Sequence, residues 1–213
     1  MPTPDSRSLA VAITGGIGSG KTEAARIFGS LGAKVLYADQ LAAHLVDSQP
    51  EIRRRIRREF GERVLSPDGM LNRKVMAQLI FKDSLLKEKL DAIVHPPVLE
   101  AIEREIEKFK RSGAGAILMV EAALIFEARA DVLFDYVTVV DAPEKERISR
   151  IMKRDVLSRA EAVYRIRSQI PAESKVADAD FVIRNAGDRK LLERSCRFLH
   201  RLLLAAVRTP RPK

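Results

Sequence analysis

The sequence predicts a three-layer α/β fold with a mostly parallel sheet, and three observations carry this prediction. Short apolar runs, several of them β-branched, alternate with amphipathic helical patterns along the chain. A glycine-rich stretch follows the first apolar run directly. Two helical stretches are too long to be simple crossovers between strands. Alternation of this kind places helices on both faces of a parallel sheet.

The first predicted strand, 10–14, leads into a loop that consists of Gly15, Gly16, Ile17, Gly18, Ser19, Gly20, Lys21 and Thr22. This loop matches the phosphate-binding pattern G-x-x-x-x-G-K-[ST] in full, so the fold is predicted to be a P-loop fold. Glycines let backbone N–H groups turn inward around an anion, and the following helix adds the positive end of its dipole. In this pattern Lys21 reaches the β- and γ-phosphates, and the Thr22 hydroxyl ligates a Mg²⁺ that bridges them. A dinucleotide fingerprint has different glycine spacing and leaves Lys21 and Thr22 unexplained.

The helix after this loop is predicted to run through Phe28 and to be capped by Gly29. The second strand, 33–38, ends before Asp39. Ligands of open parallel sheets bind at the carboxyl ends of the strands, so Asp39 is expected close to the phosphate loop. A carboxylate there can accept a proton from an attacking hydroxyl or help to position magnesium. Asp39 is also well placed to cap a helix that begins at Gln40, and the two roles are compatible.

The first long helical stretch, about 40–110, is interrupted at 66–69 and at 95–97. The third strand, 116–120, ends before Glu121, a carboxylate that can hold magnesium through water. A helix is predicted between this strand and the fourth, 136–140. Long excursions from a rigid sheet are where a site for a second substrate and a closing lid are built.

The second long stretch, about 143–175, is dense in arginine. Spacings of three and four residues put Arg147, Arg150 and Arg154 on one helix face. The segment 158–161 has the form of a capping box and starts another helix. We interpret this hairpin as a lid whose arginines neutralise charge on the transferring phosphoryl group, and a solvated charged helix is the alternative. The fifth strand, 181–183, and a final helix complete the order.

The formal net charge of +9 raises a nucleic-acid hypothesis, with six residues from Arg53 to Arg58 as the obvious patch. That patch lies in a helical pattern with Ile52, Ile56 and Phe60 on one side, so its arginines are expected to form a solvated face. The chain has no Trp and three Tyr, which leaves few rings for stacking bases. A single cysteine fits a reducing cytoplasm, and no segment approaches a membrane span. We therefore expect a cytoplasmic protein with no nucleic-acid or membrane partner, and infer no obligate protein partner.

The order and spacing of several motifs resemble dephospho-CoA kinase from about residue 9 to 190. The matching residues are the phosphate loop, Asp39, Asn72-Arg73, Phe81, His95-Pro96, Leu124 to Glu127, Arg150, Arg154, Gln169, Ala179-Asp180, Val182-Ile183 and Asn185. The loop alone is shared by many nucleotide enzymes, whereas the combination is far more specific. Family members usually have proline where Ala123 stands and glutamine where Arg147 stands, and neither departure removes a reacting group.

The resemblance implies ATP-dependent phosphorylation of the ribose 3′-hydroxyl of dephospho-CoA, with Mg²⁺. By residue match Asp39 is the base, Lys21, Arg150 and Arg154 act with it, and Asn185 lies near the adenine. The acceptor side comprises Arg73, His95, Pro96, Leu124, Phe126 and Glu127. The implied organisation is one P-loop kinase domain over 1–213. Its core covers about 9–40, 113–142 and 178–206, with a helical acceptor-binding insertion at 41–112 and a helical lid at 143–177.

Two classes of protein compete with a small-molecule kinase. A regulatory GTPase needs Asp-x-x-Gly and Asn-Lys-x-Asp, but no glycine here has an aspartate three residues before it, and the segment 185–188 lacks the lysine. A nonenzymatic nucleic-acid-binding protein leaves the phosphate loop unexplained. Protein-kinase motifs are absent from the sequence. Within the kinase class, a nucleoside or nucleotide kinase stays open as the alternative, since the same loop and lid can serve another acceptor.

Overall fold

The computed structural model describes residues 7–113 and 116–208, except for the side chain of Lys82. The two ends of the predicted domain, 1–6 and 209–213, lie outside the described residues. The chain divides into two compact units. We call Met1–Tyr37 together with Ile106–Lys213 the sheet unit, and Ala38–Glu105 the helical unit.

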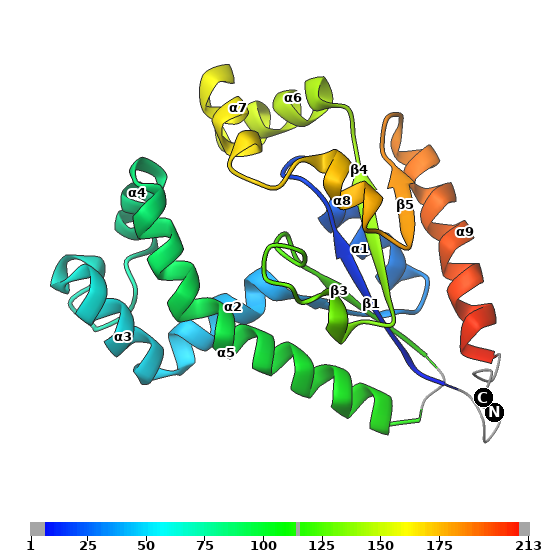
Figure 1. The fold of residues 1–213 in the computed structure, drawn as a ribbon, viewed down its shortest axis with the longest axis horizontal. Coiled ribbons are helices and arrows are strands. Elements are labelled where there is room, and N and C mark those ends of the chain that lie inside the picture. Colours follow the sequence, from blue (N-terminus) through cyan, green and yellow to red (C-terminus); the bar gives the residue numbers. More distant parts are fainter. Residues whose placement is uncertain (1–6, 114–115, 209–213) are drawn as a thin grey trace. The chain divides into compact units, whose positions relative to one another are not determined.

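The sheet unit contains a five-stranded sheet in the order β2-β3-β1-β4-β5, and every neighbouring pair is parallel (Figure 1). The prediction of a mostly parallel sheet is confirmed, and each predicted strand agrees with the structure to within one residue at either end. The strands are β1 (Leu9–Thr14), β2 (Lys34–Tyr37), β3 (Ile117–Glu121), β4 (Tyr136–Asp141) and β5 (Phe181–Arg184).

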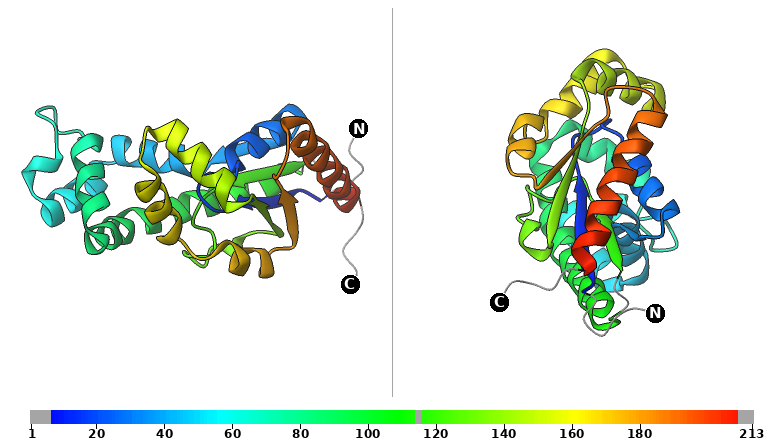
Figure 2. Two further views of the ribbon diagram at one scale, coloured as in Figure 1. Left: turned by 90° about the horizontal axis from the view of Figure 1, so that it is seen from above. Right: turned by 90° about the vertical axis from the view of Figure 1, so that its right-hand side faces the viewer.

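Strand β1 lies in the middle of the sheet and is buried along its whole length. Helices α1 (Lys21–Ser30) and α9 (Arg189–Arg208) pack on each other and on one face of the strands. Helix α8 (Ala172–Ala177) packs on β4 and lies on the other side of the sheet (Figure 2, right). The unit also contains η2 (Asp131–Leu133), α6 (Glu144–Asp155) and α7 (Arg159–Arg167). The apolar face of α9, which includes Leu192, Cys196, Leu199 and Leu203, is buried in this core.

Two local predictions in the sheet unit are wrong. Gly29 does not end α1, which continues to Ser30. A Cβ at Gly29 would lie 3.3 Å from the Val35 side chain, so this glycine serves the close packing of α1 on β2. The helix expected between the third and fourth strands is not an α-helix. Turns and η2 occupy that connection, in which the Ala123 carbonyl and the Glu127 carboxylate contact Lys175 of α8.

A buried carboxylate joins the beginnings of β1 and β4. Asp135 is 7% exposed and accepts hydrogen bonds from Arg7 at 2.6 Å and from the Ala10 N–H at 2.9 Å. Lys110 Nζ lies 2.9 Å from Oδ2, the same oxygen that accepts from Ala10. Burial acts to raise the pKa of Asp135, but the hydrogen bonds from Ala10, Lys110 and Arg7 outweigh it and hold the pKa below the ordinary value. This cluster fixes the amino-terminal edge of the sheet, opposite the phosphate loop.

The helical unit is formed by α2 (Ala38–Ser48), α3 (Pro50–Phe60), η1 (Glu62–Val64), α4 (Arg73–Lys82) and α5 (Ser84–Arg111), whose last turns belong to the sheet unit. The predicted apolar side of the arginine-rich helix is confirmed, since Ile52, Ile56 and Phe60 are buried in α3. The break at 66–69 is also confirmed as a tight turn, in which Gly69 has φ 76°.

The predicted break at 95–97 is wrong, because α5 runs through Pro96 and Pro97. Proline removes a backbone donor but keeps a φ that fits a helix. Ile93 and Val98 are buried on the two sides of the prolines, and Ala101 and Ile102 are buried further along. This burial offsets the lost hydrogen bonds. Within the described residues, no helix is long and apolar enough to cross a membrane.

Candidate active site

The predicted phosphate loop connects β1 to α1, so the strand–loop–helix context that the motif requires is present. Gly15, Gly18 and Gly20 have φ values of 147°, 79° and 100°, which side chains rarely adopt. Gly20 is the N-cap residue of α1 and has no side chain to cap the helix. The first N–H groups of a helix lack partners within the helix and attract anions. An anion at this end of α1 would therefore meet the first N–H groups of the helix beside Lys21 and Thr22.

Sheet topology brings other chain segments to the same edge. The register pairs Ile13 of β1 with Glu121 of β3, so this carboxylate ends β3 beside the start of the loop. Glu121 is 5% exposed. On the other side of β1, strands β4 and β5 end at Asp141 and Arg184, which are paired with each other. Ligand sites of open parallel sheets lie at this edge.

Asn185 follows β5 and binds the phosphate loop through a side-chain hydrogen bond. Its backbone N–H donates to the Asp141 carbonyl at 2.6 Å, and its side-chain Nδ2 donates to the Ser19 carbonyl at 2.7 Å. The residue is 8% exposed. A Cβ added to Gly20 would lie 2.3 Å from this Nδ2. The structure thus brings Asn185 together with the loop, and its predicted place near the adenine stays a prediction.

This contact gives a test of the loop. We expect Gly20→Ala to weaken ATP binding by about tenfold or more, the worth of one hydrogen bond to a charged group, because the new methyl displaces Asn185 or the loop. The matched control is Gly32→Ala, since Gly32 has φ 101° and nothing within 4 Å of an added Cβ. Each variant loses about 1–2 kcal/mol of stability from the positive φ. Calorimetric titration with ATP checks the prediction, and equal affinities for the two variants would contradict it.

The lid arginines occupy different positions. Arg150 Nη1 lies 3.3 Å from the Gly18 and Ser19 carbonyl oxygens, while Nη2 donates to the Asn185 carbonyl at 3.3 Å and to Glu146 at 2.6 Å. Arg154 instead donates to Asp155 at 2.8 and 3.0 Å. The hydrogen bond with Asp155 raises the pKa of Arg154. Arg150 is therefore at the loop, whereas the structure does not bring Arg154 to it. The predicted capping box is confirmed, with Ser158 and Glu161 exchanging hydrogen bonds.

Two further residues of the lid contact the loop: Arg147, which helical spacing placed on the same face as Arg150, and Gln169, which received no role from sequence reasoning. Arg147 Nε donates to the Ile17 carbonyl at 3.0 Å, and Gln169 Oε1 accepts the Ile17 N–H at 2.7 Å. Both backbone groups of Ile17 are thus bound by the lid. A Cβ at Gly16 would lie 2.4 Å from the Arg147 guanidinium, so a larger residue there would displace this side chain. The helix face that Arg147 shares with Arg150 was the sequence signal for Arg147. Gln169 was already among the residues that match the family.

Arg147 is 6% exposed and borders a pocket of about 370 Å³ with Asp141, Glu144 and Glu173. Burial lowers the pKa of its guanidinium, and attraction to the three carboxylates opposes that change. An arginine stays charged under either influence. The lid consequently adds a permanent, partly neutralised cation beside the loop.

The segment Leu124 to Glu127 follows β3 in the sheet unit. Ile125 is its buried anchor, with 2% exposed. Glu127 lies 2.7 Å from Lys175 of α8, a fully buried lysine that sequence reasoning missed entirely. No sequence pattern marks this lysine, since it stands alone in a short helix. Leu124 and Phe126 are half-buried in the same segment.

The other predicted site residues belong to the helical unit. Asp39 is exposed in the first turn of α2, which begins at Ala38, so it is not the cap of a helix starting at Gln40. Arg73 donates to both oxygens of Asp47, at 2.8 and 2.9 Å. His95 immediately precedes Pro96 in α5, and its Nε2 lies 3.5 Å from Oδ1 of Asp91, one helical turn earlier.

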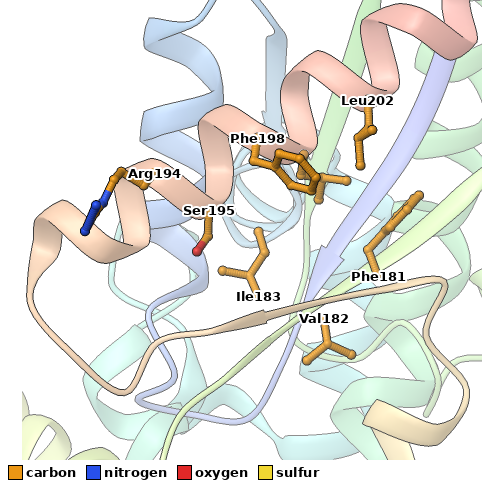
Figure 3. Close-up of a pocket in the computed structure, with 8 residues that line it drawn as sticks. Phe181, Val182, Ile183, Arg194, Ser195, Phe198 and Leu202 are labelled. Atoms are coloured by element: carbon orange, nitrogen blue, oxygen red, sulfur yellow. The ribbon is translucent and has the colours of Figure 1, made fainter.

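A second pocket, of about 390 Å³, lies between β5 and α9 (Figure 3). Its apolar lining includes Phe181, Ile183, Phe198 and Leu202, and Arg194 and Ser195 lie toward one end. None of the predicted site residues lines it. This pocket is therefore distinct from the predicted phosphate site.

Comparisons with known proteins agree with this geometry. The profile of the dephospho-CoA kinase family matches residues 9–190. Dephospho-CoA kinase of Moorella thermoacetica is 39% identical over 88% of each chain. That of Geobacter sulfurreducens is 41% identical over 86% of this chain and 93% of its own. The solved structure of dephospho-CoA kinase from Campylobacter jejuni is 27% identical, covers 93% of this chain and 98% of its own, and superposes with a TM-score of 0.71. The chain belongs to the dephospho-CoA kinase family.

Proposed function

We propose that the phosphate loop, Asp39 and the lid arginines of this chain transfer the γ-phosphoryl group of ATP to the ribose 3′-hydroxyl of dephospho-CoA. The products are coenzyme A and ADP, and the family catalyses this reaction as the last step of coenzyme A biosynthesis. The observation that carries the assignment of residues is the loop edge, where the glycine loop, Arg150 and Asn185 are joined by hydrogen bonds. From the single cysteine we also propose a cytoplasmic location.

Lys21 and Thr22 bind the phosphates in this proposal. Lys21 opens α1 and supplies a mobile cation where negative charge gathers between the β- and γ-phosphates. The donors present also fit Mg²⁺: the Thr22 hydroxyl at the start of α1 and the buried Glu121 carboxylate at the end of β3. Within the described residues, no group of three His, Cys, Asp or Glu could hold a metal. That suits an ion held mainly by ATP oxygens and water, which neutralises phosphate charge when bound.

Asp39 is the proposed base. It stands two residues after the end of β2, in the first turn of α2. Its carboxylate would accept the proton of the 3′-hydroxyl as the oxygen attacks the γ-phosphorus, and would orient that hydroxyl beforehand. Arg73, His95 and Pro96 are the proposed acceptor contacts of the helical unit. Leu124, Phe126 and Glu127 are those of the sheet unit.

The reaction class is tested by a coupled assay of ADP release with dephospho-CoA, adenosine, AMP and shikimate as alternative acceptors. We expect rapid ADP release with dephospho-CoA alone, together with a product whose mass has increased by one phosphoryl group. Mapping of the product should place the new phosphate on the ribose 3′ position. Faster turnover with adenosine or AMP would replace the proposal by a nucleoside or nucleotide kinase.

The lid arginines give a further prediction. Closure over both substrates excludes water and aligns the acceptor, so ATP hydrolysis without acceptor is expected to be slow. Arg150 already contacts the loop, whereas Arg154 must leave Asp155 to reach a phosphate. We expect Arg150→Ala or Arg154→Ala to lower acceptor-stimulated turnover by about 10³-fold or more, the scale of a charge-neutralising arginine, while ATP affinity falls much less.

Single-turnover rates measured beside ATP affinity check this prediction. The control is Arg197→Ala, which removes an exposed arginine of α9 that pairs with Glu193 at 2.7 Å. A parallel loss of rate and affinity in the lid variants would assign these arginines to ground-state binding alone. Equal ADP formation with and without dephospho-CoA would refute the coupling of closure to the acceptor.

A further inference from the structure

The residue that α8 buries is a lysine. Of the lysine side chains that the structure describes, Lys175 alone is fully buried, with 0% exposed. Burying a cation carries a high desolvation cost unless its ammonium is closely paired. An apolar side chain would anchor a helix of this kind without that cost. A lysine at this position instead ties α8 to particular oxygen atoms.

Those oxygen atoms belong to one segment. Lys175 Nζ donates to the Ala123 carbonyl at 3.1 Å and lies 2.7 Å from Glu127 Oε1. Both carboxylate oxygens of Glu127 are buried, and within the described residues neither accepts a hydrogen bond of good geometry. The contact between the two side chains is therefore an ion pair. Glu127 turns its charge inward to Lys175, and the segment from Ala123 to Glu127 is held at both ends by one ammonium group.

The same lysine is connected to the phosphate loop by two short routes. The Ala123 carbonyl also accepts a hydrogen bond from Thr14 Oγ1 at 3.3 Å, and Thr14 immediately precedes the loop. On the other route, Gln169 precedes α8 and accepts the Ile17 N–H of the loop at 2.7 Å. The stretch from Gln169 to Lys175 thus touches the phosphate loop at its start and the segment after β3 at its end.

We propose that Lys175 is a positioning residue of the kinase, which fixes the segment 123–127 against the phosphate loop so that the acceptor binds in register with ATP. This inference rests on the acceptor role given to that segment under the proposed function. Lys175 and Glu127 act through the backbone they hold and not by contact with the reacting atoms. Removal of the ammonium therefore impairs use of the acceptor more than use of ATP.

The test compares Lys175→Met, the double variant Lys175→Met/Glu127→Gln, and the control Lys110→Met. Lys110 also pairs with a buried carboxylate, that of Asp135, but at the opposite edge of the sheet. We expect Lys175→Met to raise the KM for dephospho-CoA by about ten- to a hundredfold, the scale of a misplacement near 1 Å. The KM for ATP should change by less than about twofold in all three variants, because the ATP-binding loop keeps its own contacts.

The double variant separates positioning from stability. It leaves no unpaired buried charge, so its melting temperature should rise above that of Lys175→Met. Its KM for dephospho-CoA should stay high, because the segment 123–127 still lacks the ammonium group that binds it in the wild-type protein. Recovery of both quantities in the double variant would overturn the proposal, as would a rise of acceptor KM in Lys110→Met that matches Lys175→Met. The double variant also provides the kinetic test if Lys175→Met alone does not fold.

Amide hydrogen exchange measures the stability of the segment after β3 in the absence of substrate. The N–H groups of Ala128, Arg129 and Ala130 bond to the carbonyls of Leu124, Phe126 and Ile125 at 2.8–3.0 Å. Their exchange should accelerate in both Lys175 variants and not in the control. Unchanged exchange would refute the anchoring by Lys175. Faster exchange with an unchanged acceptor KM would refute the acceptor role of the segment, and the positioning role of Lys175 with it. The proposed reaction would not be affected by that result, because it is tested on the wild-type protein.

Discussion

Lys21→Ala is expected to lower the turnover number by about 10²- to 10³-fold or more, the scale found when a preorganised electrostatic donor is removed. The charge of Lys21 meets more negative charge in the transition state than in the resting ATP complex, so the rate falls further than ATP affinity. The fold should be preserved. Lys21 opens α1, and removing a cation from a helix N-terminus changes stability by only about 0.3–1 kcal/mol, in the favourable direction.

Single-turnover rates, ATP affinity and thermal unfolding are measured together for Lys21→Ala. Lys190→Ala is the matched control, because Lys190 is an exposed lysine in the first turn of another helix of the sheet unit, α9. The control should keep wild-type turnover. Near-normal turnover in folded Lys21→Ala would remove the phosphate loop from the mechanism.

Asp39→Asn is expected to reduce turnover by about 10²- to 10⁴-fold, the usual contribution of a general base. Asparagine keeps the shape of the side chain and loses only its basic charge. Because Asp39 is exposed in the first turn of α2, its favourable interaction with the helix dipole is worth about 0.3–1 kcal/mol, and the loss of stability should not exceed that.

The control for this variant is Asp68→Asn, which changes an exposed aspartate of the turn 66–69 in the same unit. Its carboxylate accepts a local hydrogen bond, from the Met70 N–H at 3.2 Å. The single-turnover rate should fall in Asp39→Asn and stay at the wild-type value in Asp68→Asn. If the Asp39 variant unfolds more easily but reacts at the normal rate, the residue serves the helix and another group takes the proton.

The strands and the phosphate loop were predictable because local sequence determines them. Each strand is a mainly apolar run, and β1 is buried over all of its residues. The loop needs glycine at particular points of the chain, and three of its glycines do have positive φ. In such places the short-range preferences of the chain agree with its tertiary environment.

The errors arise where distant contacts outweigh local preference. Pro96 and Pro97 locally favour a break, but burial of the flanking apolar residues keeps α5 continuous. The connection after β3 was expected to be helical, yet its carbonyl and carboxylate oxygens are drawn to Lys175, which lies far along the chain. A pattern within a short window carries no information about such partners.

The residues of the candidate site also divide into those that local sequence predicted and those that depend on distant contacts. Lys21 and Thr22 follow from a contiguous motif, and Arg150 from helical spacing. The contacts of Arg147 and Gln169 with Ile17 depend on how the lid folds back over the loop, so spacing alone did not assign them. The lone lysine of α8 is the clearest case, because only burial distinguishes it from a surface residue.

The central place of β1 has a consequence for synthesis of the chain. The first strand to leave the ribosome pairs with β3 and β4, which begin only at Ile117 and Tyr136. At about 5–20 residues per second, its apolar residues wait several seconds or longer for both partners. During that time the nascent phosphate loop has no sheet to support it, and β1 is a natural target for chaperones. Nascent chains released before β4 has emerged should therefore be degraded or aggregate, however complete their nucleotide motif.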